Sequence, residues 1–288
     1  MSIEIRRAPV TAADGVTSEL SIVAPAAPCS VLVFTCGLGI EAGYYEPFAR
    51  ALAEAGHAVA LAEVRGVGSS SVRPSRSVDF GYRELVELEL PAAIEAARAC
   101  FEGVPLLVGG HSLGAQVSVL AGANLPPEVR GLVLVAGGAV WYRNWEGSMR
   151  RYVRLAGLLF PAVSSALGWF PGRLFGFGGE REARTLMHDW SSCASTGHYR
   201  LAGPGRDWDT AAVEQRRPTL GITIEGDEMA PPRSIAQLTA KMPHADVRLA
   251  RVAPSRPGEG KAHFRWARAP QEVVAVIDGW IRGVVAAG

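Results

Sequence analysis

The stretch that decides the fold of this chain is residues 104–120, which read VPLLVGGHSLGAQVSVL. Its apolar beginning is typical of a buried strand, and its end is typical of the opening turns of a helix. Between the two lies Gly-x-Ser-x-Gly, with Ser112 at its centre and Gly110 and Gly114 on either side. Because glycine has no side chain, strand and helix can approach closely at such a turn. In this context the motif predicts a nucleophilic serine raised above a sheet, with an ordinary glycine-rich turn as the alternative.

Strand-like runs alternate with helical patterns along most of the remaining sequence. Strands are expected at residues 4–8, 19–24, 30–35, 58–64, 106–110, 131–135, 219–224 and 246–252. Helical patterns cover residues 46–55, 82–100 and 116–123, with Pro91 inside the second. The closely spaced first strands indicate an antiparallel start, and the later strands, separated by helices, indicate a parallel sheet. The sequence therefore predicts an α/β fold with a mostly parallel eight-stranded sheet covered by helices.

The alternation stops after the sixth expected strand, and residues 139–217 carry no convincing sheet strand. This aromatic-rich segment is predicted to be a mainly helical cap inserted into a core of residues 1–138 and 218–288. An insertion at this point can cover the carboxyl ends of the strands, where ligands bind in open α/β sheets. We expect several of its aromatic side chains to line a pocket; the alternative is that they form only the insertion's own core.

Composition and charge exclude several classes of protein. With 29 Lys and Arg against 28 Asp and Glu, the net charge of +1 predicts no nucleic-acid partner. The four cysteines lack the spacing of a metal site, so we expect no metal or other cofactor. Separate reduced thiols favour a cytoplasmic location, and residues 1–10 lack the apolar core of a secretory signal.

The most apolar segment, residues 152–170, contains Arg154 and Pro161 and does not have the uninterrupted apolar character of a membrane span. It is predicted to form a buried or pocket-lining helix. An amphipathic helix that binds a surface is the alternative.

A serine hydroxyl is a weak nucleophile until a base takes its proton. His263 is the predicted base because it follows the last expected strand, in a loop that should return over the carboxyl edge of the sheet. This position suits the chain order serine, acid, histidine. A loop histidine without a catalytic role is the alternative. The other histidines are assigned to the turn, a strand start, the insertion or the surface: His111, His57, His188, His198 and His244.

The base in turn needs an acidic residue, which fixes its tautomer and stabilises its charged form. Asp227 is the predicted acid, because it follows a glycine turn at the carboxyl end of the expected strand 219–224. Glu225 and Glu228 are close neighbours and stay as alternatives.

Backbone N–H groups should hold the negative charge that develops on the substrate oxygen. We expect one from Leu113, directly after the serine, and one from Leu38, in a glycine-containing loop after the third strand. Cys36 in that loop is a weak alternative nucleophile, since nothing near it in sequence activates its thiol. The predicted pocket residues are aromatic: Tyr44, Tyr45, Trp141 and Trp145.

These motifs together resemble the α/β-hydrolase superfamily, in family order and over nearly the whole chain. The matching pieces are residues 110–114, the glycine loop 37–39, the turn 65–69, Asp227 with Pro231, and His263. More narrowly, the chain is similar to a bacterial group of serine α/β hydrolases with a helical cap. The segments that carry this similarity are Gly43-Tyr44-Tyr45, Trp141-Tyr142 with Trp145, Phe170-Pro171-Gly172-Arg173 and His263-Phe264-Arg265.

The chain departs from the superfamily pattern at two places. Many members carry His-Gly in the oxyanion loop, where this chain has Cys36-Gly37. The serine nucleophile also separates it from the dehalogenase and epoxide-hydrolase branches, which use a carboxylate.

The motifs and the resemblance predict a serine hydrolase of the carboxylesterase or thioesterase type, acting on a small to medium apolar ester or thioester. The expected partner is that small molecule, with no nucleic acid and no membrane span; homodimer formation is left open. Two alternatives remain. The same triad could serve a lyase, cyclase or acyl-transfer reaction in a specialised biosynthetic pathway, or the chain could be a non-catalytic ligand-binding relative.

Overall fold

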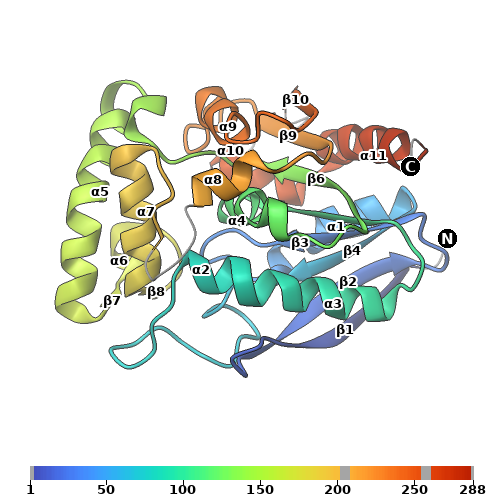
Figure 1. Cartoon of the computed structure of the whole chain (residues 1–288), viewed down its shortest axis with the longest axis horizontal. Helices are drawn as coiled ribbons and strands as arrows, with labels where there is room; N and C mark the ends of the chain where they lie inside the picture. Colours follow the sequence, from blue (N-terminus) through green and yellow to red (C-terminus); the bar gives the residue numbers. More distant parts are fainter. Residues whose placement is uncertain (1–2, 202–207, 254–260, 287–288) are drawn as a thin grey trace.

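The computed structural model describes residues 3–201, 208–253 and 261–286 (Figure 1). Its main sheet has eight strands in the order β1-β2-β4-β3-β5-β6-β9-β10. Their bounds are β1 Ile3–Thr11, β2 Thr17–Pro25, β3 Ser30–Thr35, β4 His57–Ala62, β5 Leu106–His111, β6 Val129–Val135, β9 Thr219–Ile224 and β10 Val247–Val252. Strand β2 is antiparallel to β1 and β4, and the remaining pairs are parallel. The predicted mostly parallel α/β sheet is confirmed.

Helices cover both faces of this sheet. Their bounds are α1 Glu46–Glu54, α2 Tyr82–Glu84, α3 Leu90–Cys100, α4 Leu113–Ala121, α5 Gly147–Leu167, α6 Gly172–Phe175, α7 Arg184–Thr196, α8 Trp208–Val213, α9 Pro232–Thr239, α10 Ala262–Arg265 and α11 Gln271–Ala286. Helices α1 and α11 pack together on one face, and α3, α4 and α9 lie on the other (Figure 1). Every residue of β3, β4, β5 and β9 is buried as a result. This explains their almost continuous apolar sequence.

The predicted helix at residues 82–100 consists of three consecutive helical pieces. A π-helical turn, Leu85–Glu89, separates α2 from α3. Pro91 lies in the first turn of α3, directly after this wider turn. Proline has no N–H to donate, so it is tolerated at a helix start but not inside a regular helix.

The segment between β6 and β9, which we call the insertion, is mainly helical and contains α5, α6, α7 and α8. Two short strands, β7 Trp169–Phe170 and β8 Glu182–Ala183, pair with each other and not with the main sheet. Helices α5 and α7 pack together, at the left of Figure 1. Residues 202–207 of the predicted cap lie outside the described residues.

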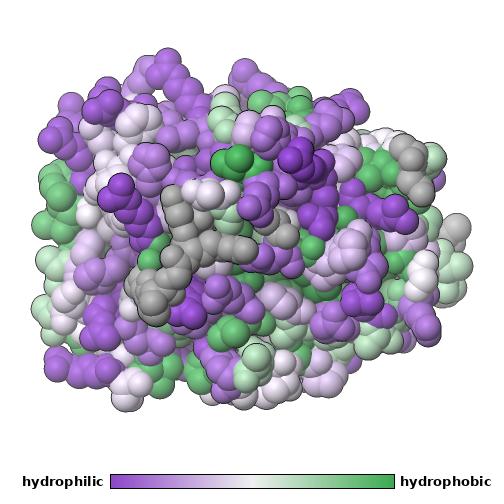
Figure 2. Space-filling model, viewed as in Figure 1, coloured by the Kyte–Doolittle hydropathy of each residue, from purple (hydrophilic) through white to green (hydrophobic). Residues whose placement is uncertain are grey.

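The apolar segment 152–170 forms most of α5, but that helix is not buried on all sides. Leu155, Leu158 and Leu159 are each more than half exposed, whereas Phe160 and Ala156 on the other side are buried. Figure 2 shows hydrophobic residues along the edge of the molecule that α5 forms. The prediction of a buried or pocket-lining helix thus holds for one face at most: α5 packs on the rest of the insertion through that face, and none of its residues lines the cavity described below. No helix in the described parts of the chain is long and apolar enough to cross a membrane.

The turn from β5 into α4 is strained and closely packed. Ser112 has φ 53° and ψ −110°, a conformation that side chains with a Cβ rarely adopt. A Cβ added to Gly114 would lie 2.1 Å from the carbonyl oxygen of Thr35, at the end of β3. A Cβ at Gly110 would lie 2.5 Å from the carbonyl carbon of Gly114. The turn can therefore form only with very small residues at these two positions.

We expect Gly114→Ala to lower the free energy of unfolding by roughly 2–3 kcal/mol, because its methyl group would push α4 away from β3. Gly279→Ala is the matched control, since a Cβ there meets nothing within 4 Å. Inside α11 that change should stabilise the chain by up to about 1 kcal/mol. Urea unfolding of both variants measures the difference. Equal stability of the two variants would contradict the steric argument.

Candidate active site

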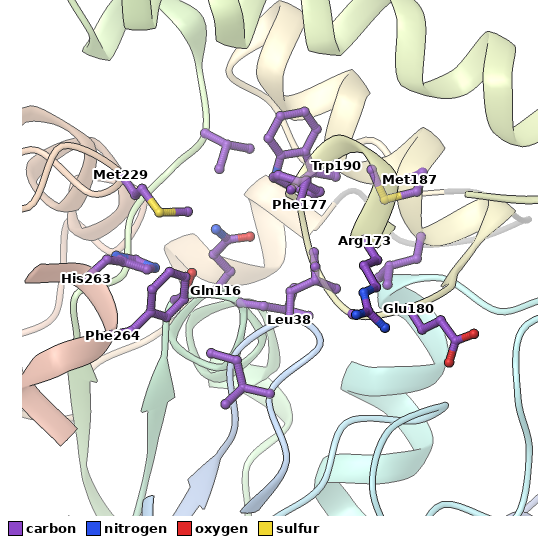
Figure 3. Close-up of a pocket in the computed structure, with 18 of the residues that line it drawn as sticks. Leu38, Gln116, Arg173, Phe177, Glu180, Met187, Trp190, Met229, His263 and Phe264 are labelled. Carbon is purple, nitrogen blue, oxygen red and sulfur yellow. The ribbon is translucent and has the colours of Figure 1, made fainter. Parts of the chain in front are cut away.

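A cavity of about 550 Å³ lies beyond the carboxyl ends of β3, β5, β6 and β9. The insertion forms its opposite wall (Figure 3). Residues from the sheet edge include Leu38, Ser112, Leu113, Met229 and His263. Residues from the insertion include Arg173, Phe177, Glu180, Leu186, Met187 and Trp190. Most of these side chains are apolar, so the cavity suits a substrate with a hydrophobic part.

Ser112 stands on the strained turn with its side chain on the cavity wall. Its N–H donates to the carbonyl of Val135, which ties the turn to the neighbouring strand β6. The serine is half-buried, and its hydroxyl forms no hydrogen bond with another described residue. The turn thus presents an unengaged hydroxyl to whatever occupies the cavity.

His263 and Asp227 form a buried pair behind the cavity wall. His263 Nδ1 lies 2.8 Å from Asp227 Oδ2, and both side chains are almost fully buried. The other carboxylate oxygen accepts hydrogen bonds from the N–H groups of Met229 and Ala230. These bonds fix the carboxylate, which in turn fixes the orientation of the imidazole ring. His263 also lines the same cavity as Ser112.

The two alternative acids do not reach His263. Glu225 is exposed and pairs with Arg251 at 3.2 Å, and Glu228 is exposed. Of the three neighbouring acidic residues, only Asp227 points inward, because its oxygens are held by the turn at the end of β9.

Leu38 and Leu113, the predicted oxyanion donors, both line the cavity. The Leu113 N–H is the first of α4 and has no partner within the helix. Leu38 N–H donates to no backbone oxygen in the described residues. Cys36 in the same loop is fully buried, and burial raises the pKa of its thiol well above the usual value. That thiol is therefore a poor nucleophile.

A chain of hydrogen bonds that the sequence analysis did not identify runs beneath the cavity. The N–H of Gly37 donates to Tyr45 Oη at 2.9 Å, and Tyr45 Oη lies 2.8 Å from His111 Nδ1. His111 Nε2 lies 2.9 Å from the carbonyl oxygen of His263. Since that carbonyl can only accept, Nε2 carries the proton, and Nδ1 accepts from the Tyr45 hydroxyl. The chain links the loop of Leu38 to the segment of His263.

The electrostatic setting keeps His111 neutral. Burial lowers the pKa of His111 well below its ordinary value, and the neighbouring His263 lowers it further. A charged imidazolium would have to give up the Tyr45 donor, because it has no acceptor nitrogen. The assigned tautomer and the lowered pKa therefore agree.

The four aromatic residues predicted for the pocket are not among the residues that line this cavity. Tyr45 lies fully buried below it, in the hydrogen-bond chain. Tyr44 donates to the carbonyl of Phe264, and Trp145 Nε1 donates to the carbonyl of Glu228. Trp141 stacks under the Arg143 guanidinium and packs against Gly197. These side chains support loops around the cavity instead of facing it.

The aromatic residues that do line the cavity come from other positions: Tyr82, Phe177, Trp190 and Phe264. Phe177 and Trp190 were part of the aromatic-rich insertion, so composition alone could indicate the region but not the residues. Which aromatic side chains of the insertion face the cavity depends on how α7 and the loop after α6 pack.

A second serine, histidine and aspartate array lies at the opposite edge of the sheet. His57 is hydrogen-bonded to Ser30 and Asp278, at 2.8 Å each, and its Nδ1 is 3.3 Å from Cys29 Sγ. Ser30 and His57 are fully buried at the amino ends of β3 and β4. None of these four residues lines the cavity. The array therefore joins α11 to the sheet, and substrate has no access to the Ser30 hydroxyl.

Glu182 is a buried carboxyl group beneath the loop that closes one side of the cavity. It accepts a hydrogen bond from the N–H of Gly179, and burial raises its pKa to about 7. The same loop packs closely on the loop of Leu38: a Cβ at Gly39 would lie 1.9 Å from the Gly179 nitrogen. Glu182 thus helps to hold the insertion against the sheet edge.

We expect His111→Gln to reduce the loss of stability in mild acid. In wild type the unfolded chain binds a proton near pH 6.5 and the folded chain does not. This residue therefore lowers the free energy of unfolding by about 1.4 kcal/mol per pH unit below that value. The stability that comes from a neutral His111 is therefore complete above pH 6.5 and is lost as the pH falls below that value. Urea unfolding between pH 7.5 and 5 measures the slope.

His244→Gln is the matched control, because His244 is exposed. Its unfolding slope should equal that of wild type. If His111→Gln also keeps the wild-type slope, His111 is not held neutral by the fold.

We expect Glu182→Gln to stabilise the chain at pH 8 by roughly 1–3 kcal/mol, with little effect at pH 5. Between the unfolded pKa near 4.5 and the folded pKa of about 7, only the unfolded chain loses its proton. The free energy of unfolding therefore falls as the pH rises through this range, because the folded chain keeps a proton that the unfolded chain releases. Glutamine keeps the acceptor for Gly179 without a buried charge. Thermal unfolding at both pH values measures the effect, with exposed Glu180→Gln as control. A less stable Glu182→Gln at pH 8 would contradict this account.

Residues 3–201, 208–253 and 261–286 contain no group of three or more His, Cys, Asp or Glu side chains arranged to hold a metal ion. Gly260, in the predicted loop of His263, lies outside the described residues.

Comparisons with known proteins agree with this architecture. No curated protein matches the chain. Similar solved structures include the esterase domain of a Rhodothermus marinus protein, with 16% identity, coverage of 99% of this chain and 100% of that chain, and a TM-score of 0.64. An esterase from Pyrococcus furiosus is 14% identical, with coverage of 97% of this chain and 91% of that chain and a TM-score of 0.61. An α/β hydrolase from Penicillium sp. sh18 is 15% identical, with coverage of 99% and 98% of the two chains and a TM-score of 0.60. At these identities the likeness shows the fold alone.

The profile of the α/β-hydrolase fold family matches residues 30–255, which is most of the chain. The match contains the strand-to-helix turn, the insertion and the turn that carries Asp227. This chain therefore belongs to the α/β-hydrolase family.

Proposed function

We propose that this chain is a serine hydrolase that cleaves an ester or thioester through an acyl-enzyme. The observation that carries the proposal is the arrangement of three groups around one cavity. An unengaged serine hydroxyl on a strained turn and the His263 imidazole line the same cavity, and Asp227 holds that imidazole from behind. A nucleophile, a base and a group that orients the base are the parts such a reaction needs.

Ser112 attacks the substrate carbonyl, and His263 Nε2 takes the serine proton. Asp227 keeps the proton on Nδ1 and stabilises the imidazolium that forms. His263 then gives its proton to the leaving alcohol or thiol, which leaves an acyl group on Ser112. A water molecule, activated by the same imidazole, releases the acid and restores the serine.

The backbone N–H groups of Leu38 and Leu113 stabilise the oxyanion of the tetrahedral intermediate. Both residues line the cavity beside Ser112, and the first N–H of α4 is unpaired within its helix. Donors that are already in place need no reorganisation when the charge develops. The hydrogen bond from Gly37 to Tyr45 steadies the loop that carries Leu38.

The substrate has a hydrophobic part of small to medium size. Apolar side chains of the insertion, such as Phe177, Leu186 and Trp190, support this choice, as does a volume of about 550 Å³. We also propose that residues 139–217 act as a cap on a core of residues 1–138 and 218–288. Two of the structural neighbours, from Rhodothermus marinus and Pyrococcus furiosus, are named as esterases, which favours the same reaction class.

We expect Ser112→Ala to lower kcat on p-nitrophenyl esters by at least about 1,000-fold, the scale known for loss of a catalytic serine. Wild type should also bind a fluorophosphonate covalently, and Ser112→Ala should not. The measurement is release of p-nitrophenol over a series of acyl lengths, with product acids identified. Transfer of the acyl group to another acceptor in place of water would favour an acyltransferase.

Ser30→Ala is the matched control, because Ser30 belongs to the second serine, histidine and aspartate array. Thermal unfolding checks that this variant is folded. The folded variant should keep wild-type activity and fluorophosphonate labelling. Wild-type turnover in Ser112→Ala, or its loss in a folded Ser30→Ala, would overturn the assignment.

A further inference from the structure

Arg173 is an exposed arginine that lines the cavity and has no partner among the described residues. It is the one arginine among the described lining residues, and it forms no ion pair or side-chain hydrogen bond with any described residue. Nearby arginines of the insertion are engaged: Arg184 pairs with Asp79, and Arg181 lies over the ring of Trp169. An arginine without a partner at the wall of a mostly apolar cavity is available to a ligand.

Apart from Glu180, the other polar side chains of the cavity are already engaged or belong to the proposed triad. Gln116 accepts from the Tyr82 hydroxyl and donates to the carbonyl of Gly138. Glu180 lines the cavity, but Figure 3 shows its carboxylate pointing away from the other labelled side chains. Arg173 is therefore the cation of the described cavity lining that is left to recognise a substrate.

The position of Arg173 is set by a compact turn. The N–H of Leu174 donates to Pro171, that of Gly176 to Arg173, and that of Phe177 to Gly172. In Figure 3, Arg173 lies on one side of the pocket and His263 on the other, and the Arg173 side chain extends toward Leu38. A ligand that reaches both groups must cross the apolar part of the cavity.

We infer that Arg173 binds a carboxylate at the far end of the acyl chain, so that the preferred substrates are esters or thioesters of dicarboxylic acids. This inference rests on the proposed function. The scissile carbonyl lies at Ser112, the methylene chain passes along Leu38 and Phe177, and the terminal carboxylate meets the guanidinium. The fork of a guanidinium matches two carboxylate oxygens.

Charge matching favours a carboxylate over a phosphate. The described lining offers a single unpaired cation, which balances one negative charge but not two.

The test compares p-nitrophenyl monoesters of adipic and suberic acid with p-nitrophenyl hexanoate and octanoate, which have the same chain lengths and no terminal charge. We expect Arg173→Gln to lower kcat/KM for the monoesters by roughly 10-fold, mainly through KM, and to change the neutral esters by less than about twofold. Arg173→Lys should recover part of the loss, because it restores the charge without the fork.

Arg151→Gln is the matched control. It removes the same charge from an exposed position on α5 that does not line the cavity, and should leave both ester series unchanged. Equal losses on charged and neutral esters in Arg173→Gln would overturn the inference, as would a wild type with no preference for the monoesters.

Binding to Ser112→Ala separates this inference from the proposed function. We expect calorimetry to show tighter binding of monomethyl adipate than of uncharged dimethyl adipate, and loss of that difference in Ser112→Ala/Arg173→Gln. If no ester is hydrolysed but this difference is present, the hydrolase proposal fails and the carboxylate site stands. If Ser112→Ala binds both compounds equally, the carboxylate site fails whatever the outcome of the activity assay.

Discussion

The close contact between α4 and the end of β3 is the constraint on which the rest of the site depends. Thr35 and Gly114 approach so closely that no side chain fits between them. This contact forces the chain to turn sharply at Ser112, which takes up an unfavourable backbone conformation as a consequence. Strain of this kind persists only where the surrounding packing determines it. Here the buried parallel strands on either side of β5 supply that packing.

From this turn, hydrogen bonds extend to the loops on both sides. His111 precedes the serine and holds the backbone of His263, while Tyr45 connects His111 to Gly37. One buried, neutral histidine thus sets the relative position of the nucleophile, the proposed base and the proposed oxyanion loop. The Gly37 N–H can only donate and the His263 carbonyl can only accept. Tyr45 and His111 between them each donate once and accept once, so the geometry permits a single arrangement of protons.

The insertion gives the cavity its shape and its charge. Its loop at Gly179 packs on Gly39, and Glu182 fastens that loop from below. Its side chains provide part of the hydrophobic wall and also Arg173. The proposed catalytic residues lie at the sheet edge, and the insertion supplies the facing wall of the cavity.

Local sequence patterns determined the class of the fold and the identity of the main polar groups. Apolar runs and the glycine-flanked serine predicted the sheet and its strand-to-helix turn, because these depend on short-range sterics and on burial. Chain order singled out His263 and Asp227, and the structure brings these two together. Tertiary structure decided which aromatic residues face the cavity, since Tyr45 and Trp145 are turned away by hydrogen bonds to distant backbone groups. The same holds for Arg173: that it has no partner among the described residues depends on where the insertion folds, and could not be inferred from neighbours in sequence.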